Sequence, residues 1–148
     1  MAARRYILLL SVALYLVSMP MDAFCEQSSC SDWPGFGILL FGVFDFLVDQ
    51  RNLTWFANPL LFAAWLLIWR EWRRVRWRAL GGILGVLAAV LAIAFLFRKE
   101  IVTNEAGIPF PITGLRIGYW LWLASIGTAV AAAFMPGKPR ASVVEPTH

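Results

Sequence analysis

The sequence predicts an all-α membrane protein with four transmembrane helices and one short additional helix. Composition is the first observation: the 148 residues are 60% hydrophobic and 15% charged, with a mean hydropathy of +0.69, whereas soluble domains are about half apolar and a quarter charged. The second is that long uncharged segments recur along the chain. The third is a run with five arginines, residues 70–78, between two of those segments. Such a run does not enter a bilayer core, so it is predicted to be a cytoplasmic turn between two spans.

We expect the four spans at residues 6–19, 54–69, 79–97 and 117–135. The first two are shorter than the ~20 residues typical of a span, so they are expected to draw on flanking residues or to lie in locally thinned lipid. The first follows two arginines, as a signal peptide would. The residues after it make a poor cleavage site, so we expect a retained signal anchor. The proline-containing tail, residues 136–148, is predicted to be a disordered cytoplasmic end.

Residues 36–49 form a fifth apolar segment that is expected not to span. A helix of this length reaches about 20 Å, against a hydrocarbon core of roughly 30 Å. Counting it as a span gives a five-helix alternative, which places the arginine run outside against the positive-inside rule. We therefore expect a periplasmic interfacial or re-entrant helix. Its polar stripe, formed by Gly42, Asp45 and Asp49, is expected to face water.

The four-span topology separates the charges by sign. Both termini are then cytoplasmic, with nine of the 13 basic residues inside and seven of the nine acidic residues outside. The bilayer accounts for these positions, so the net charge of +4 does not indicate nucleic acid as a partner. The arginine run is expected to attract anionic lipid, through Arg70, Arg73, Arg74, Arg76 and Arg78.

Cys25 and Cys30 are the two cysteines of the chain, and the topology places both in an external loop. An oxidising compartment favours a disulfide between them. A redox pair is the alternative, although four residues separate the two cysteines where redox motifs usually have two. Metal binding is weaker still, because two thiols leave a tetrahedral site half empty.

The inventory for catalysis is poor, and we expect neither an enzyme nor a bound cofactor. The histidine of the chain is His148, its last residue, so histidine-activated nucleophiles and histidine metal sites are not expected. Asp45 is either solvated at the interface or, as the alternative, part of a transport path, since acids near lipid are costly and often functional. No ionisable residue lies inside the four predicted spans.

Aromatic residues are expected at both membrane interfaces. Trp65, Trp69, Trp72 and Trp77 form the predicted cytoplasmic belt. Two further groups open the second and fourth spans at the outer interface. Among these, Asn58 lies one turn inside the apolar run, and Pro59 removes an amide donor, so the asparagine is expected to satisfy backbone or cross-helix partners. Ridges of small residues predict close helix packing within the chain, at Gly81, Gly85 and Ala89 and at Ala124, Thr128 and Ala132.

Two motifs carry a resemblance. Trp-Phe-Ala-Asn-Pro-Leu-Leu, residues 55–61, is followed by Gly-Tyr-Trp-Leu-Trp-Leu-Ala-Ser, residues 118–125. Together they resemble paired motifs of small, uncharacterised bacterial multi-pass membrane proteins. The resemblance implies a four-helix bacterial inner-membrane protein without implying an activity. It also implies that both motifs lie on one side, which makes Asn58, Tyr119 and Ser125 candidates for a shared polar cluster near the outer leaflet.

The function that we expect is non-enzymatic binding of a membrane or periplasmic partner at the outer face. The partner is another membrane subunit, or an incoming toxin if the chain is an immunity protein. Two alternatives stay open: a small transporter or channel subunit that uses Asp45, and a membrane thiol redox protein that uses Cys25 and Cys30. The candidate partner-binding residues are Trp55, Asn58, Pro59, Arg116, Tyr119, Trp122 and Ser125.

Overall fold

The computed structural model describes residues 2–26, 34–48, 53–70, 75–102 and 108–135. Helices occupy the five segments where the sequence predicts them, so the mostly helical fold is confirmed. The predicted tail lies outside the described residues. The helices are α1 (Ala2–Ser18), α2 (Gly35–Val48), α3 (Ala57–Arg70), α4 (Val75–Ala94) and α5 (Ile117–Phe134); a 3-10 turn, η1 (Thr54–Phe56), precedes α3, and another, η3 (Phe95–Phe97), follows α4.

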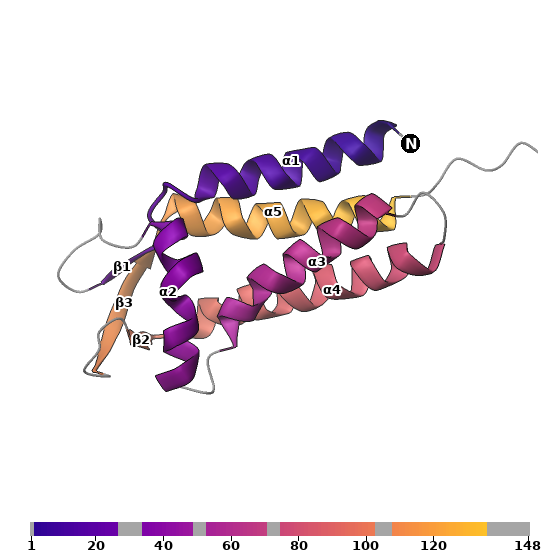
Figure 1. Cartoon of the computed structure of the whole chain (residues 1–148). Coiled ribbons are helices and arrows are strands. Elements are labelled where there is room, and N and C mark those ends of the chain that lie inside the picture. The colour runs from indigo at the N-terminus through magenta and orange to yellow at the C-terminus, as the bar shows by residue number, and fades with distance from the viewer. Residues whose placement is uncertain (1, 27–33, 49–52, 71–74, 103–107, 136–148) are drawn as a thin grey trace, which may run out of the picture.

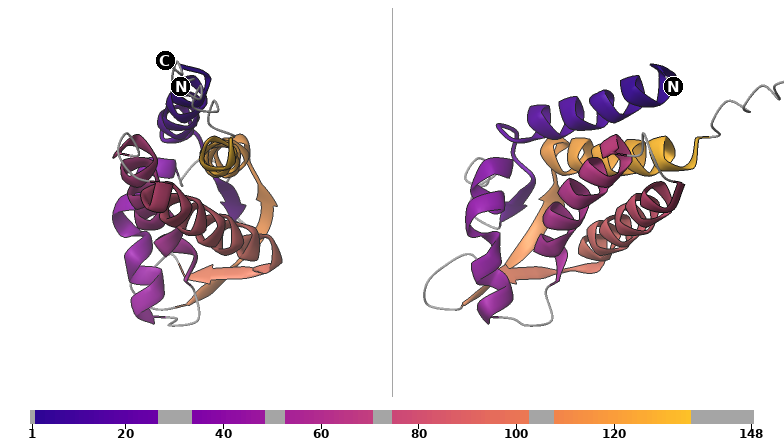
Figure 2. Two further views of the ribbon diagram at one scale, coloured as in Figure 1. Left: turned by 90° about the vertical axis from the view of Figure 1, so that its right-hand side faces the viewer. Right: turned by 45° about the vertical axis from the view of Figure 1, so that its right-hand side comes forward.

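Four of the helices run alongside one another, and α2 crosses one end of them (Figure 1). Helix α1 packs mainly on α5, α3 packs on α4, and α4 also contacts α5. The first residues of α1 and α4 and the last residues of α3 and α5 share one end, which we call the arginine end. We call the opposite end, with α2 and three strands, the sheet end (Figure 2). The arginine end is defined by Arg4, Arg5, Arg70, Arg76 and Arg78.

Two helical segments are long and apolar enough to cross a bilayer: Arg76–Phe97, of 22 residues, and Ile117–Phe134, of 18 residues. In these segments 33% and 39% of the most apolar window is buried inside the protein. A core helix of a soluble protein is mostly buried, whereas less than half of each of these windows is buried. Helices α1 and α3, with 17 and 14 residues, are apolar but shorter.

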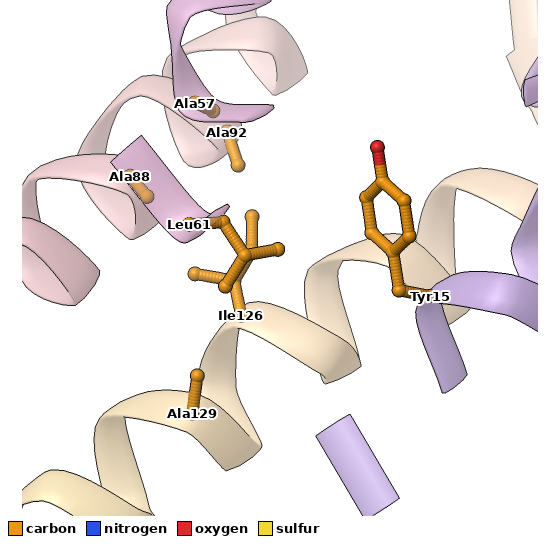
Figure 3. Close-up of a cluster of buried hydrophobic side chains, with 7 residues drawn as sticks. All are labelled: Tyr15, Ala57, Leu61, Ala88, Ala92, Ile126 and Ala129. Carbon is orange, nitrogen blue, oxygen red and sulfur yellow. The ribbon is translucent and has the colours of Figure 1, made fainter. Parts of the chain in front are cut away.

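The interior between the four helices is built from small residues around a few larger ones. Figure 3 shows the main cluster, in which Leu61 of α3 and Ile126 of α5 meet among alanines from α3, α4 and α5. Close approach of α4 depends on glycine, because a Cβ at Gly81 would lie 2.9 Å from Ile68 Cγ1 and 3.3 Å from the Ala64 carbonyl oxygen. The ridge in α4 therefore packs inside the chain, as predicted. In the second ridge Ala132 is buried, but Ala124 is exposed.

A three-stranded antiparallel sheet covers the sheet end of the bundle, and the sequence did not predict it. The strands are β1 (Phe24–Glu26), β2 (Glu100–Val102) and β3 (Pro109–Leu115), in the order β1-β3-β2. Alternate residues of β3 are exposed, while Ile112 and Leu115 pack against a cluster of Phe24, Phe95 and Tyr119. The sheet thus covers the end of α4 and the start of α5 with a hydrophobic layer.

Helix α2 is attached along one side. The amides of Gly35 and Phe36 donate to the carbonyls of Met21 and Met19, at 3.0 and 2.9 Å. Further along, Trp55 Nε1 donates to the Leu39 carbonyl at 2.9 Å. The prediction that Gly42 faces water is wrong: a Cβ there would lie 2.8 Å from Trp55 Cδ1, so Gly42 faces η1. Of the other two residues of that predicted stripe, Asp49 and the side chain of Asp45 lie outside the described part of the chain.

Candidate functional site

Asn58 is buried at the start of α3, where its side chain joins three segments. The Oδ1 atom accepts hydrogen bonds from the Tyr15 hydroxyl at 3.2 Å and from Trp122 Nε1 at 3.0 Å. The Nδ2 atom donates to the Trp55 carbonyl at 3.3 Å. In a regular helix that carbonyl would accept from residue 59, but proline has no N–H to give. The asparagine therefore satisfies both backbone and cross-helix partners, as expected. We call Tyr15, Trp55, Asn58 and Trp122 the asparagine cluster.

A second polar group joins α1, α3 and α5 nearer the arginine end. The Ser11 hydroxyl donates to the Ser125 carbonyl at 2.6 Å and accepts from Trp65 Nε1 at 2.9 Å. Thr128 Oγ1 donates to the same Ser125 carbonyl at 2.9 Å. The Ser125 hydroxyl is fully buried and has no hydrogen-bond partner among the described residues. We call Ser11, Trp65, Ser125 and Thr128 the serine cluster.

Trp65, predicted to lie in the cytoplasmic aromatic belt, packs inside the bundle. Its indole is half-buried and bonds to Ser11, and its ring packs edge-on against Tyr15 at 5.3 Å between centroids. Depth along the helix places a tryptophan near an interface, but the face of the helix decides whether it meets lipid. Trp69 and Trp77 are exposed near the arginine end, and Trp72 lies outside the described residues.

Tyr119 forms a separate contact. Its buried hydroxyl donates to the Ala92 carbonyl of α4 at 2.9 Å, and its ring lies 5.9 Å from that of Trp122. Asn58, Tyr119 and Ser125 therefore do not share one polar cluster; each bonds to a different part of the bundle. The resemblance placed all three near one side, but their partners are set by the helix faces that meet in the fold.

The predicted partner-binding residues divide into two groups by exposure. Asn58, Tyr119 and Ser125 are buried, and Trp122 and Trp55 are half-buried with their indole nitrogens bonded inside the protein. Their hydrogen bonds hold helices of the same chain together. Pro59 and Arg116 are exposed, so these two are the predicted residues that remain free to meet an outside partner.

The arginine end contains a contact that the sequence did not suggest. Arg4 Nη2 donates to the carbonyl of Met135 at 2.7 Å, and Arg78 Nη1 approaches the same oxygen at 3.5 Å. Met135 directly follows α5, so two cations cap the negative end of this helix. No sequence signal connects residues 131 positions apart. Among the predicted lipid-binding residues, Arg70 and Arg76 are exposed, and Arg73 and Arg74 lie outside the described residues.

Cys25 is buried in β1 opposite Gly114. The described part of the chain has no free cysteine thiol, and Cys30 lies outside it, so the pairing of the two stays a prediction. Within the described residues no group of three acidic, cysteine or histidine side chains lies close enough to hold a metal ion.

No family model matches this chain, and no match is found among curated proteins or solved structures.

Proposed function

We propose that the chain is a non-enzymatic, multi-pass bacterial inner-membrane protein with α1, α3, α4 and α5 as its four spans. Large exposed apolar side chains on all four helices support this, because soluble monomers rarely expose large contiguous apolar surfaces. Examples from the four helices are Leu9 and Leu16, Leu66, Ile83 and Val90, and Trp120 and Phe134. Lipid is the solvent that such a surface requires.

The orientation follows from the arginine end. Five arginines from α1, α3 and α4 gather there, and positive charge is retained in the cytoplasm. We therefore assign the arginine end to the cytoplasm and the sheet end to the periplasm. Reporter fusions after Arg78 and after His148 test this, with cytoplasmic signals expected at both. A periplasmic signal after Arg78 would replace the four-span topology with the five-span one.

Helix α1 acts in this proposal as a retained anchor. Leu8, Ser11, Tyr15 and Ser18 are buried at intervals of three or four residues, the spacing of one helix face. Two of them bond to α3 and α5. Cleavage after this helix would remove the main neighbour of α5 and leave polar groups of the bundle without partners.

The outer face binds a protein partner, either a second membrane subunit or an incoming toxin. The observation that carries this is the ordered layer at the sheet end, which presents the exposed side of β3, with Pro109, Pro111 and Thr113, next to the exposed Arg116. A fixed outer layer is a surface that a partner can recognise by shape. Packing of the bundle favours binding over transport, because the buried polar residues described, Ser11, Ser18, Asn58 and Ser125, are all uncharged.

Photocrosslinking in the native membrane tests the partner. A photoreactive phenylalanine analogue at Pro111 is expected to give a defined adduct with another protein. The same analogue at the exposed, lipid-facing Val90 of α4 is the matched control and is expected to give none. If Pro111 and further exposed positions of β3 give no protein adduct at native expression, partner binding at this face is wrong.

A further inference from the structure

Helix α2 presents an apolar face that no part of the described chain covers. Phe36, Leu40, Phe41, Phe44 and Leu47 are exposed by 53 to 63%. Four of them follow one another at intervals of four, four and three residues, so at about 100° per residue they lie on one side of the helix. We call these five residues the phenylalanine face.

The phenylalanine face is fixed outward, because the opposite side of α2 is held against η1. Gly42 abuts the Trp55 ring, and Trp55 Nε1 donates to the Leu39 carbonyl. Phe46 packs edge-on against Phe56, with ring centroids 5.0 Å apart. Two backbone hydrogen bonds also fasten the first turn of α2 to the segment after α1. Rotating α2 to bury its phenylalanines would break all of these contacts.

We propose that lipid acyl chains of the outer leaflet cover the phenylalanine face, with α2 lying lengthwise in the membrane interface. This inference rests on the proposed membrane placement. Helix α2 crosses the directions of the four spans at the sheet end (Figures 1 and 2), so upright spans leave it in the plane of the bilayer. Its 14 residues extend about 21 Å, too short to cross a core of roughly 30 Å.

Continuity with the surface of α1 favours lipid over a protein as the occupant. The Phe36 amide bonds to the Met19 carbonyl, which brings the start of the phenylalanine face to the end of α1. There Leu16, Val17 and Met21 are exposed as well, so one apolar surface runs from a span onto α2. Protein interfaces carry a polar rim, whereas this border has exposed apolar residues where the rim would lie.

The consequence is a fixed depth for the outer layer. With α2 held at the level of the outer leaflet, the contacts of Trp55 and Phe56 tie the start of α3 to that level. The sheet and its exposed residues then stand at the membrane surface, where a partner arriving along the bilayer meets them. This role of α2 deepens the proposed function and does not depend on which partner binds.

A nitroxide label on Phe44→Cys tests the proposal in the full chain, reconstituted unreduced into phosphatidylethanolamine–phosphatidylglycerol vesicles. Dissolved oxygen concentrates in acyl chains and a nickel chelate stays in water, so the ratio of their relaxation effects reports the environment. At Phe44 we expect strong relaxation by oxygen and little by nickel. Phe46→Cys, on the packed side of α2, is the matched control and is expected to respond weakly to both. Leu40→Cys provides a second position on the phenylalanine face.

The outcomes separate the inference from the proposed function. Val90→Cys on α4 is the lipid reference, since that side chain is exposed in the middle of a candidate span. Strong nickel relaxation at Phe44 and Leu40 beside a lipid-like Val90 overturns the role of α2 alone. Weak relaxation by both reagents at Phe44 and Leu40 means that a protein, such as a second copy, covers the face, and also overturns it. Nickel access at Val90 overturns the membrane placement itself. Label incorporation into the unsubstituted protein sets the background from native thiols.

Discussion

Helices α1 and α4 both pack against α5, but they are attached by different means. Helix α1 is tied by side-chain hydrogen bonds, from Ser11 to the Ser125 carbonyl and from Tyr15 to Asn58. Helix α4 approaches α5 mainly through glycines, with Gly82 against Ala133 and Gly85 against Val130, beside one hydrogen bond from the Tyr119 hydroxyl to the Ala92 carbonyl. Lipid offers no hydrophobic drive for helices to associate, so polar contacts and close backbone packing are the two means available. In this protein hydrogen bonds predominate where α1 meets its neighbours, and close packing at glycine predominates where α4 meets its neighbours.

The close contacts of α4 are expected to be the more sensitive to a single substitution, as measured by the free energy of unfolding. Gly81→Leu places a side chain where a Cβ alone would lie 2.9 Å from Ile68 Cγ1, so α3 and α4 must separate. We expect a loss of about 3 kcal/mol in the free energy of unfolding, measured by titration with SDS in mixed micelles. Gly127→Leu is the matched control, because a Cβ there meets nothing within 4 Å. Equal losses for both variants would show that glycine matters here for helix propensity and not for packing.

A covalent link at the sheet end would add a third means of attachment. We expect Cys25 and Cys30 to form an intramolecular disulfide, which fixes the loop after β1. By the loop-entropy relation such a small loop contributes at most roughly 2 to 3 kcal/mol. When the unreduced protein is treated with an alkylating reagent, its mass is expected to stay unchanged, because both sulfurs are held in the disulfide. Free thiols in most molecules would rule out a structural disulfide between these two cysteines.

In the asparagine cluster, Asn58→Leu removes the acceptor of the Tyr15 and Trp122 hydrogen bonds and the donor to the Trp55 carbonyl. We expect insertion to continue, because an amide leaves an apolar segment, and stability to fall on the order of 1 kcal/mol. Asp45→Asn is expected to leave the stability unchanged and to complement the deletion of the gene as well as the unsubstituted protein does. The two variants are compared at matched expression. A normal Asn58→Leu protein beside an inactive Asp45→Asn protein would favour the transporter alternative.

The smallest effect is expected from Ser11→Ala. It breaks the bond from α1 to the Ser125 carbonyl and removes the acceptor of Trp65, for a loss of about 0.6 kcal/mol in the same titration. Ser18→Ala is the matched control, since the Ser18 hydroxyl bonds to the Tyr15 carbonyl within the same segment and crosses to no other helix. A loss for Ser18→Ala as large as for Ser11→Ala would mean that cross-helix bonding contributes nothing measurable.

The sequence predicted the helices well because each is a long apolar segment bounded by charge, proline or glycine. It missed the sheet because two strands have three residues each, and because the third contains prolines, which are unusual in strands. In β3 the amide of Ile112 donates to the Lys99 carbonyl at 2.8 Å, while the prolines occupy alternate positions. Pairing of β1 with β3 joins residues about ninety positions apart, which no local pattern reveals.

The candidate site was predicted in part for a similar reason. Asn58 was recognised because an amide beside a proline in an apolar run needs partners, and the structure supplies them. Neither Tyr15 nor Ser11 stood out, because a hydroxyl in a membrane segment is ordinary until its helix face is known. Arg4 was assigned to topology alone, although its guanidinium also caps α5. The type of each residue and its position along its helix follow from the sequence, whereas the neighbour toward which its side chain points depends on how the helices pack.

The contact between Arg4 and Met135 also bears on how the chain is made. Helix α1 is synthesised well before its main neighbour, α5, and their ends meet at a single carbonyl oxygen. During synthesis Ser11 of α1 therefore lacks its acceptor on α5 until more than a hundred further residues have been added. Folding of this protein thus includes a late step, in which α1 gains its main contacts only after α5 has been made.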